Sequence, residues 1–467
     1  MPLILGANSV SGYTVKNSLR FNSGSSDYLN KTFTTPTNQK IWTFSTWIKR
    51  SNLGTGQSFF DGYTGPSTRT QLMFDSSDGI RALDQVNMNL ISTQLFRDIS
   101  AWYHIVIAVD TTQATSTNRV KIYVNGSQIT SFSSSTYPAQ NTNLLINGAN
   151  AHDLGRTGAY TNEYFDGYQS EVYFIDGQQL TPSSFGETDT LSGIWIPKAY
   201  TGSFGTNGFY LQFKNSAALG TDSSGNGNTW TVNNLTSVDQ STDTPTNNFA
   251  TMNPLRQPTG NPATLTNGNL TIATQNTGYY GGRSTISVSS GKWYFEAKLV
   301  SQTSGNLGYI GIQNADSYTP EMFNSSSGAF AGYSSTGYSY SGFDGAKTNN
   351  NSDTAYGNSY TTNDIISVAL DLDNSKLYFA KNGTWQNSGV PTSGATGTGA
   401  ISITSGLTYL FAVDDANNSN SLVWDCNFGS PPYSVTGSAD GAGLGNFSYA
   451  VPSGYYALCT KNLANFG

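Results

Sequence analysis

Acidic side chains on two expected strands are the residues that could hydrolyse a glycosidic bond. Retaining glycosidases use two carboxyl groups about 5 Å apart, which one strand can supply at positions i and i+2. Glu171 in SEVYFIDG has a tyrosine at i+2, and Asp176 falls in the following turn. Glu296 in YFEAK has Lys298 at i+2. Neither strand offers a same-face pair, so we expect no catalytic residues and no enzymatic activity. A pair from separate strands stays open.

The two histidines do not suit nucleophilic catalysis. His104 lies inside the expected strand AWYHIVIAVD, where packing on a sheet is the ordinary role. His152, in NGANAHDLGR, is expected in a loop, solvated or capping a turn. The sequence has no G-x-S-x-G and no Walker loop, and its many glycines do not precede helices.

One string resembles the start of a calcium loop, and the cysteines are few. DSSGNG at 222–227 would need a bidentate Glu at its twelfth position, which is Asn233, so we expect a turn. Calcium held by Asp and carbonyl oxygens of other loops stays open, but no residue set points to it. Cys426 and Cys459 are too few for a metal site, and we expect small buried hydrophobes rather than a disulfide. We therefore expect no metal and no cofactor.

The composition excludes several classes of partner. Charged residues make up 11% of the 467 positions, against about 25% in ordinary domains, and the net charge is −7. A nucleic-acid partner would need a concentrated basic face, which this acidic chain lacks. MPLILGANSV has neither a basic segment nor a long apolar one, and no stretch approaches about 18 apolar residues. We expect synthesis in the cytoplasm without a signal peptide, and no membrane insertion.

Short β-branched and aromatic runs between turn residues predict an all-β chain. In 364–373 and 291–300 apolar residues alternate with polar ones, the period of a strand. Asn125–Gly126, Asp176–Gly177 and Asn382–Gly383 each stand between strand-like runs and predict two-residue hairpins, whose central residues need positive φ. The pattern is typical of sandwiches or barrels.

Two compositional breaks predict the domain boundaries. One lies near IPKAYTGSFGTNG at 196–208, and the other is the proline-rich stretch at 240–262. We expect a sandwich over residues 1–200, a bridging segment over 201–262 and a second sandwich over 263–467. The short apolar segment at 2–10 is expected to dock on a partner protein.

Each half resembles a known family. NSLRFNSGSSDYLN, WTFSTWIKRS, AWYHIVIAVD, VKIYVNGSQI and YFDGYQSEVYFIDGQQLTPSSF resemble, in order, the strands of laminin G-like, concanavalin A-like domains over about 17–186. SSGKWYFEAKL, LGYIGIQNA, TTNDIISVALDLDNSKLYFAKNGTWQ, LTYLFAVDD and CNFGSPPY are similar to the SPRY family over about 285–435. The resemblance implies two concanavalin A-like, jelly-roll-type antiparallel sandwiches in tandem.

The arrangement as a whole resembles structural proteins of tailed bacteriophages. The TDSSGNGN bridge with WTVNN and the final PSGYYALCTKNLANFG carry that resemblance. It implies a virion surface component, such as a fibre, tail or head-decoration protein. Its partners would be other virion proteins, and symmetric self-association is expected, with a trimer as the guess.

Glycan contact is the expected activity, because sugar sites combine aromatic walls with a few aimed polar groups. In SPRY-like domains the resemblance implies that loops at one end of the sandwich carry recognition. The candidate ligand-binding residues of the second half are Tyr333, Asp344, Asn349, Asn350, Tyr356, Tyr360 and Trp385. Those of the first half are Tyr63, Arg69, Asp153, Arg156 and Tyr160.

The stretch GYSSTGYSYSGFDG at 332–345 has the composition of an antibody loop but the period of a strand. We expect Tyr338, Tyr340 and Phe343 to pack, with binding residues at the margins of the stretch. The function expected overall is a non-enzymatic phage surface protein for particle structure and host-glycan attachment. The alternatives are a secreted lectin-like protein and, last, a concanavalin A-like glycoside hydrolase.

Overall fold

The computed structural model of the protein describes residues 12–158, 160, 162–257, 262–275, 280–303, 308–317, 330–415 and 421–467. Its described residues up to Asn247 form one compact unit, and those from Asn248 onward form another. We call these units the first domain and the second domain. Each is a sandwich of two sheets around an apolar core, so the all-β expectation is confirmed.

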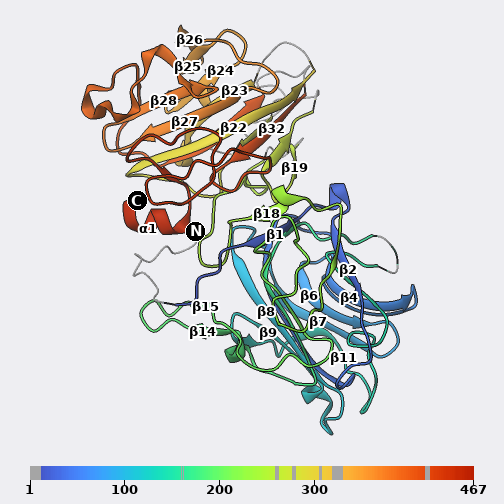
Figure 1. The fold of residues 1–467 in the computed structure, drawn as a ribbon. Coiled ribbons are helices and arrows are strands. Elements are labelled where there is room, and N and C mark those ends of the chain that lie inside the picture. The colour runs from blue at the N-terminus through green and yellow to red at the C-terminus, as the bar shows by residue number, and fades with distance from the viewer. Residues whose placement is uncertain are drawn as a thin grey trace. The chain divides into compact units, whose positions relative to one another are not determined.

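The first domain is built from two sheets of antiparallel strands (Figure 1). In one sheet the strands lie in the order β10 (Ser127–Gln128), β9 (Val120–Val124), β8 (Trp102–Asp110), β3 (Ile41–Arg50), β13 (Gly167–Asp176), β1 (Ser18–Phe21) and β18 (Gln240–Ser241). A further strand, β16 (Phe209–Leu211), pairs with β13. The order of the other is β11 (Phe132–Thr136), β7 (Met88–Leu95), β6 (Gly79–Asp84), β5 (Thr68–Phe74), β4 (Gln57–Gly65), β12 (Ala151–Leu154), β2 (Tyr28–Thr32) and β17 (Thr231–Asn233). A separate hairpin joins β14 (Gly186–Thr188) to β15 (Trp195–Pro197).

Both faces of the central strands of the first sheet are buried. On β8, Ile105 and Ile107 enter the core between the sheets, while Val106 and Ala108 face a second apolar cluster. That cluster is closed by residues such as Phe185, from the segment after β13. The strand therefore reads as a continuous apolar run rather than an alternating one, because neither of its faces meets water.

The segment expected as a bridge belongs in large part to the first domain. β16 pairs with β13, β17 pairs with β2 and β18 pairs with β1. Lys49 Nζ lies 2.8 Å from Asp243 Oδ2, and both side chains are 1% exposed. The boundary thus falls between Asn247 and Asn248, because residues 209–247 complete sheets that the earlier strands leave open.

Two of the three predicted hairpins are confirmed. Asn125–Gly126 joins β9 to β10 with φ of 47° and 81°, and Asn382–Gly383 joins β28 (Lys376–Lys381) to β29 (Thr384–Trp385) with φ of 48° and 79°. The prediction of a hairpin at Asp176–Gly177 is wrong. The Asp176 carboxylate instead accepts the backbone N–H groups of Thr37, Asn38 and Asn207, so it fastens two other loops to the end of β13.

The second domain repeats the two-layer plan. One sheet runs β19 (Thr264–Thr266), β20 (Thr271–Ala273), β32 (Leu422–Asn427), β22 (Lys292–Gln302), β27 (Ile365–Asp371), β28 and β29, with β30 (Ile401–Ser402) on β28 and β33 (Tyr456–Ala457) parallel to β22. The other runs β21 (Tyr280–Arg283), β31 (Tyr409–Asp415), β23 (Gly308–Asn314), β24 (Gly337–Ser341), β25 (Ala346–Asn349) and β26 (Ser352–Ala355). The chain ends in a short helix, α1 (Thr460–Phe466).

Short 3-10 helices connect the strands of both domains. They span Ser23–Ser25, Ser116–Asn118, Pro182–Ser184, Ser237–Asp239, Ala315–Ser317, Ala331–Tyr333, Gln386–Ser388 and Pro391–Thr396. In the part of the chain that the structure describes, no helix has the length and hydropathy needed to cross a bilayer.

The C-terminal segment, residues 430–467, covers one sheet of the second domain. The alternation predicted for β22 and β27 is observed, with Trp293 and Val368 in the main core. Tyr294 and Ala369, on the opposite face, pack in a smaller core with Phe447 and other residues of the segment. Both faces of these strands are therefore buried, as in the first domain.

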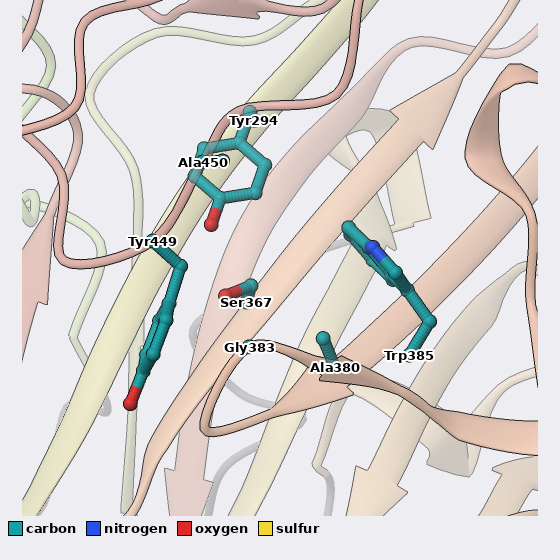
Figure 2. A pocket seen from close by; sticks show the side chains of 7 residues that line it. All are labelled: Tyr294, Ser367, Ala380, Gly383, Trp385, Tyr449 and Ala450. Atoms are coloured by element: carbon teal, nitrogen blue, oxygen red, sulfur yellow. The ribbon is translucent and has the colours of Figure 1, made fainter.

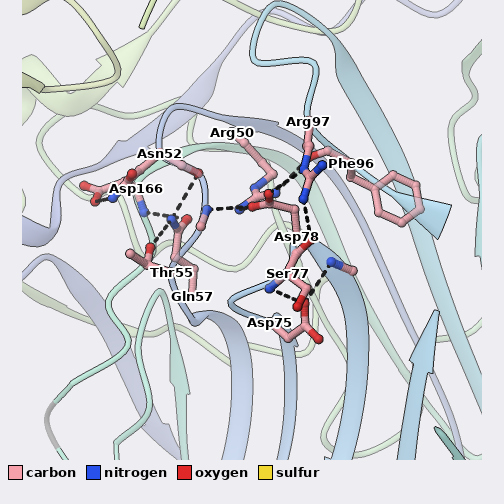
Figure 3. A network of polar contacts seen from close by, with 12 residues as sticks. Arg50, Asn52, Thr55, Gln57, Asp75, Ser77, Asp78, Phe96, Arg97 and Asp166 are labelled. Atoms are coloured by element: carbon pink, nitrogen blue, oxygen red, sulfur yellow. Dashed lines mark hydrogen bonds and ion pairs between the residues drawn. The ribbon is translucent and has the colours of Figure 1, made fainter. Parts of the chain in front are cut away.

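A buried ion-pair network ties the strands of the first domain together (Figure 3). The Arg50 guanidinium, fully buried, lies 3.0 Å from Asp78 Oδ1 and donates to the carbonyl of Phe96. Its centre is 4.2 Å from the Phe74 ring centroid. Asp78 also accepts from Arg97, whose side chain is 57% exposed. One carboxylate thus compensates a charge that the core would otherwise have to hold alone.

Candidate functional site

The outer face of β4, β5, β12 and β2 brings together the five candidates of the first half. Phe60 and Leu154 point into the core, so their neighbours Asp61 and Asp153 point outward by the period of the strand. Tyr63 pairs across the strands with Arg69. We call Tyr28, Tyr63, Tyr160 and Tyr164 the tyrosine face, because each of these rings is partly or largely exposed on this side.

Arg69 supports one ring of the tyrosine face from below. Its guanidinium centre lies 4.5 Å from the centroid of Tyr160, and Arg69 itself is 7% exposed. Its N–H groups donate to the Pro66 carbonyl and the Gln71 side chain. Tyr160 is 45% exposed, so its outer side is available to a ligand while its inner side is held by a cation–π contact.

Arg156 supports a second ring. Its Nε lies 2.5 Å from Asp153 Oδ2, and its guanidinium centre is 3.3 Å from the Tyr28 ring centroid. Gly158 follows, and a Cβ built there would lie 2.2 Å from a ring carbon of Tyr63. Only glycine therefore lets the chain cross the Tyr63 ring at this distance.

A carboxylate pair that sequence inspection missed lies beneath the tyrosine face. Asp61 and Asp153 are directly opposite each other on β4 and β12, and both are fully buried. Asp61 Oδ2 accepts the N–H of Gly158, while the Oδ1 atoms of both residues make no hydrogen bond to the described residues. Burial, and next the charge of Asp153, raise the pKa of Asp61 well above its ordinary 3.8. Inspection of i and i+2 positions could not find a pair that two separate strands supply.

Replacing Asp61 by Asn should stabilise the first domain at neutral pH. A carboxyl group with a raised folded pKa binds its proton more tightly in the folded state, so stability falls as pH rises above 3.8 toward that folded pKa. The variant should therefore be the more stable protein at pH 7, because the amide carries no charge that burial would penalise. Calorimetry of both proteins between pH 4 and 8 should show the gap widening with pH. A gap that is constant or narrows would contradict the raised pKa.

The candidates of the second half separate into four groups: two buried tyrosines, two exposed residues, two asparagines in turns, and Trp385. Tyr356 and Tyr360 were expected in a ligand-binding loop, but both are buried in the core, where their hydroxyls bond the backbone of Phe379 and of Gly308. That expectation is wrong, because the rings fill the space behind β24. Tyr333 is 40% exposed, and Asp344 is exposed at the β24–β25 turn.

The asparagines of this half serve turns. Asn349 donates its side-chain N–H to the carbonyls of Ser335 and Gly337. Asn350 has φ of 53° in the tight turn between β25 and β26. The packing expected for Tyr338 and Tyr340 is observed, but Phe343 is 62% exposed because β24 ends at Ser341.

Trp385 lines a pocket of about 300 Å³ on the sheet that the C-terminal segment covers. Figure 2 shows its ring and that of Tyr449 on opposite sides of the opening. The pocket is lined by Tyr294, Ser367, Ala380, Gly383, Trp385, Tyr449 and Ala450. Sequence inspection named Trp385 but missed Tyr294 and Tyr449, which lie about 90 and 60 positions away from it and are brought there by the fold.

The histidines and the calcium-like string have structural roles. His104 is buried, accepts from Trp195 and bonds Ser45, and burial lowers its pKa to about 3. His152 was expected in a loop, solvated or capping a turn. It is not solvated, because it is fully buried on β12 and stacks on Phe33 with 3.8 Å between ring centroids, but it does bond the preceding turn by accepting the Asn147 N–H. Asp222 accepts N–H groups of its own turn, from Ser224 and Asn228, as in an ordinary turn.

Glu171 and the two cysteines are enclosed. Glu171 sits at a bulge with φ of 51° and accepts from three tyrosine hydroxyls, of Tyr13, Tyr173 and Tyr210. Cys426 and Cys459 are both buried, and neither forms a disulfide with a described residue. Among the described residues, no group of three or more His, Cys, Asp or Glu side chains is arranged to hold a metal ion.

Two family models match the chain. The model described as the concanavalin A-like lectin/glucanases superfamily, of the laminin G type, matches residues 23–184. The SPRY domain model matches residues 292–409. A search of the curated proteins found no match.

Similar solved structures include the SPRY domain of human HERC1, at 17% identity, covering 38% of this chain and 96% of that one, with a TM-score of 0.29. A putative carbohydrate binding protein from Bacteroides ovatus is similar at 17% identity, covering 47% of this chain and 59% of that one, with a TM-score of 0.33. Stonustoxin is similar at 15% identity, covering 38% of this chain and 27% of that one, with a TM-score of 0.28. On the two family matches, the chain carries a laminin G-like, concanavalin A-like domain followed by a SPRY domain.

Proposed function

We propose that this chain is a non-enzymatic surface protein of a tailed-bacteriophage virion that attaches to host-surface glycans through the tyrosine face. It would be part of a fibre, the tail or the capsid decoration. Its partners would be other virion proteins, and it would assemble as a symmetric homo-oligomer, with a trimer expected.

The observation that carries the glycan proposal is the tyrosine face itself. Tyr160 is open to solvent on one side and rests on Arg69 on the other. A ring held this way presents a rigid flat surface with a polar hydroxyl, which suits the C–H face of a sugar and loses little entropy on binding. The match of this domain to a lectin and glucanase superfamily supports the same ligand class.

The burial of the carboxylate pair supports a binding role without catalysis. Asp61 and Asp153 are the cross-strand acidic residues nearest the tyrosine face, and neither exposes any surface. A glycosidase must bring both carboxyl groups into contact with the scissile bond. Here the Asp153 carboxylate is paired with the Arg156 guanidinium, and the Asp61 carboxylate accepts the N–H of Gly158.

The virion assignment is supported by the order of the two domains, which resembles that of phage structural proteins. Mass spectrometry of purified particles should detect the chain at a fixed ratio to the capsid protein. Particles that carry no copy would contradict the assignment while leaving the glycan proposal to be tested separately.

Glycan binding is tested by comparing two tyrosines of similar exposure. Tyr160→Ala should weaken binding of the whole protein to host polysaccharide about tenfold, which corresponds to about 1.4 kcal/mol of lost contact. Tyr333→Ala removes a 40% exposed ring from the second domain and should leave binding unchanged. A glycan array and biolayer interferometry on host polysaccharide provide the measurement. Equal binding by Tyr160→Ala and the parent protein, or release of reducing ends from the polysaccharide, would contradict the proposal.

A further inference from the structure

The Trp385 pocket in the second domain combines aromatic walls with an uncharged lining. The Trp385 and Tyr449 rings face each other across it, and the Tyr294 and Ser367 hydroxyls lie between them (Figure 2). None of its seven lining residues carries a charge. Its volume of about 300 Å³ is at the lower end for small-molecule sites, which suits one ring with its substituents.

One buried carboxylate holds two of the aromatic walls in place. Glu296 Oε1 accepts the Tyr294 hydroxyl at 2.8 Å and the backbone N–H of Tyr449 at 3.0 Å. Glu296 Oε2 accepts the N–H of Ser448 at 2.8 Å. The Tyr294 ring and the backbone at Tyr449 are thus held without a ligand, so binding would not have to order them.

The third wall is fixed by a hairpin. Trp385 follows the tight turn at Asn382–Gly383 and makes an edge-on contact with Tyr378, at 6.4 Å between ring centroids. A Cβ at Gly383 would lie 2.6 Å from the Tyr449 ring, so only glycine allows the turn to approach that wall. The strand residues Ser367 and Ala380 have small side chains, which leave the space between the rings open.

We propose that this pocket binds a single uncharged pyranose residue of a saccharide, as a second site distinct from the tyrosine face. The Trp385 and Tyr449 rings would stack on the C–H faces of the sugar. An acidic sugar or a phosphate would meet no cation on the lining. Tyr449 and Ala450 lie outside the residues that match the SPRY model, so the site belongs to the C-terminal segment as much as to the SPRY fold.

The experiment uses saturation-transfer NMR and calorimetric titration of the whole protein with methyl glycosides of glucose, galactose, mannose and N-acetylglucosamine. Glucuronate and sialic acid are titrated in the same way as negatively charged sugars. At least one neutral glycoside should bind saturably with a dissociation constant in the millimolar range. Trp385→Ala and Tyr449→Ala should each weaken that binding at least tenfold, and Trp385→Phe, which keeps a ring, should weaken it less.

The controls separate this site from the tyrosine face. Phe343→Ala removes an exposed ring from the same domain and should leave glycoside binding unchanged. Glycoside binding that is lost in Tyr160→Ala but kept in Trp385→Ala and Tyr449→Ala would belong to the tyrosine face, so a failed tyrosine face and a failed pocket give different results. Saturable binding of acidic sugars alone, binding that survives in both Trp385→Ala and Tyr449→Ala, or no binding of any neutral glycoside at millimolar concentration would overturn the proposal.

Discussion

Replacing Asp78 by Asn should lower the free energy of unfolding of the first domain by about 3 to 5 kcal/mol. The substitution keeps the shape of the side chain, and Asn tolerates the φ of 72° at this position. It removes the negative charge that faces the fully buried guanidinium of Arg50. Breaking a buried pair by neutralising one partner is costly because the other charge stays in the core, which gives the expected magnitude.

Arg97→Gln is the matched control for this prediction. Arg97 contacts the same carboxylate, but its side chain is 57% exposed, so its removal should cost less than about 1 kcal/mol. Differential scanning calorimetry of the whole protein would follow the transition of the first domain in each variant. A loss of similar size in both variants would show that Asp78 acts as a surface partner and not as the counter-charge of Arg50.

The Asp78 carboxylate also makes the stability of the first domain depend on pH in acid solution. Burial raises the pKa of Asp78, but the Gly54 N–H and the two arginines outweigh it, so that the pKa is lowered from 3.8. A depressed folded pKa contributes stability above the unfolded pKa and loses it as pH falls through the folded value. The advantage of the parent protein over Asp78→Asn should therefore be constant near neutral pH and shrink below about 3.8.

Glu296→Gln should destabilise the second domain by about 2 to 4 kcal/mol and loosen the C-terminal segment. The parent carboxylate accepts from the N–H of Ser448 and from the Asn427 side chain through Oε2. An amide nitrogen in that position would turn a donor toward both, and each buried donor left without an acceptor costs about 1 to 3 kcal/mol. Burial raises the pKa of Glu296 despite its hydrogen bonds, so relief of a desolvated charge offsets part of the loss.

Hydrogen exchange provides the measurement for Glu296→Gln. The amides of Ser448 and Tyr449 should lose protection in the variant, and the transition of the second domain should move to lower temperature. Glu187→Gln is the control, because its side chain is 51% exposed and should change stability by less than about 0.5 kcal/mol. Unchanged protection at both amides would show that the segment is held by its apolar contacts alone.

Local sequence signals predicted those parts of the fold that a few neighbouring residues decide. Asn125–Gly126 and Asn382–Gly383 form the expected hairpins, because both central residues adopt positive φ. Asp176–Gly177 has the same composition but not the same outcome, since loops from elsewhere in the chain supply donors to the carboxylate. A turn is decided by two residues only where no distant group competes for them.

The candidate sites show the same limit. Strand alternation correctly placed Tyr338 and Tyr340 in the core, yet Tyr356 and Tyr360, in a stretch of loop composition, are also buried there. The Asp61–Asp153 pair joins residues about 90 positions apart, and the Trp385 pocket needs Tyr449 from beyond the sandwich strands. Residue type indicates what a side chain can do, but long-range strand register decides which side chains meet.

The ion pair between Lys49 and Asp243 determines where the protein can be truncated and where its domains can be exchanged. A fragment that stops at residue 184, the end of the family match, would lack β16, β17 and β18 and would separate Lys49 from its buried carboxylate. It would also present fresh sheet edges, which favour aggregation. Exchange of the first domain between proteins should therefore succeed with the seam after Asn247 and fail with the seam at the limit of the recognisable motif.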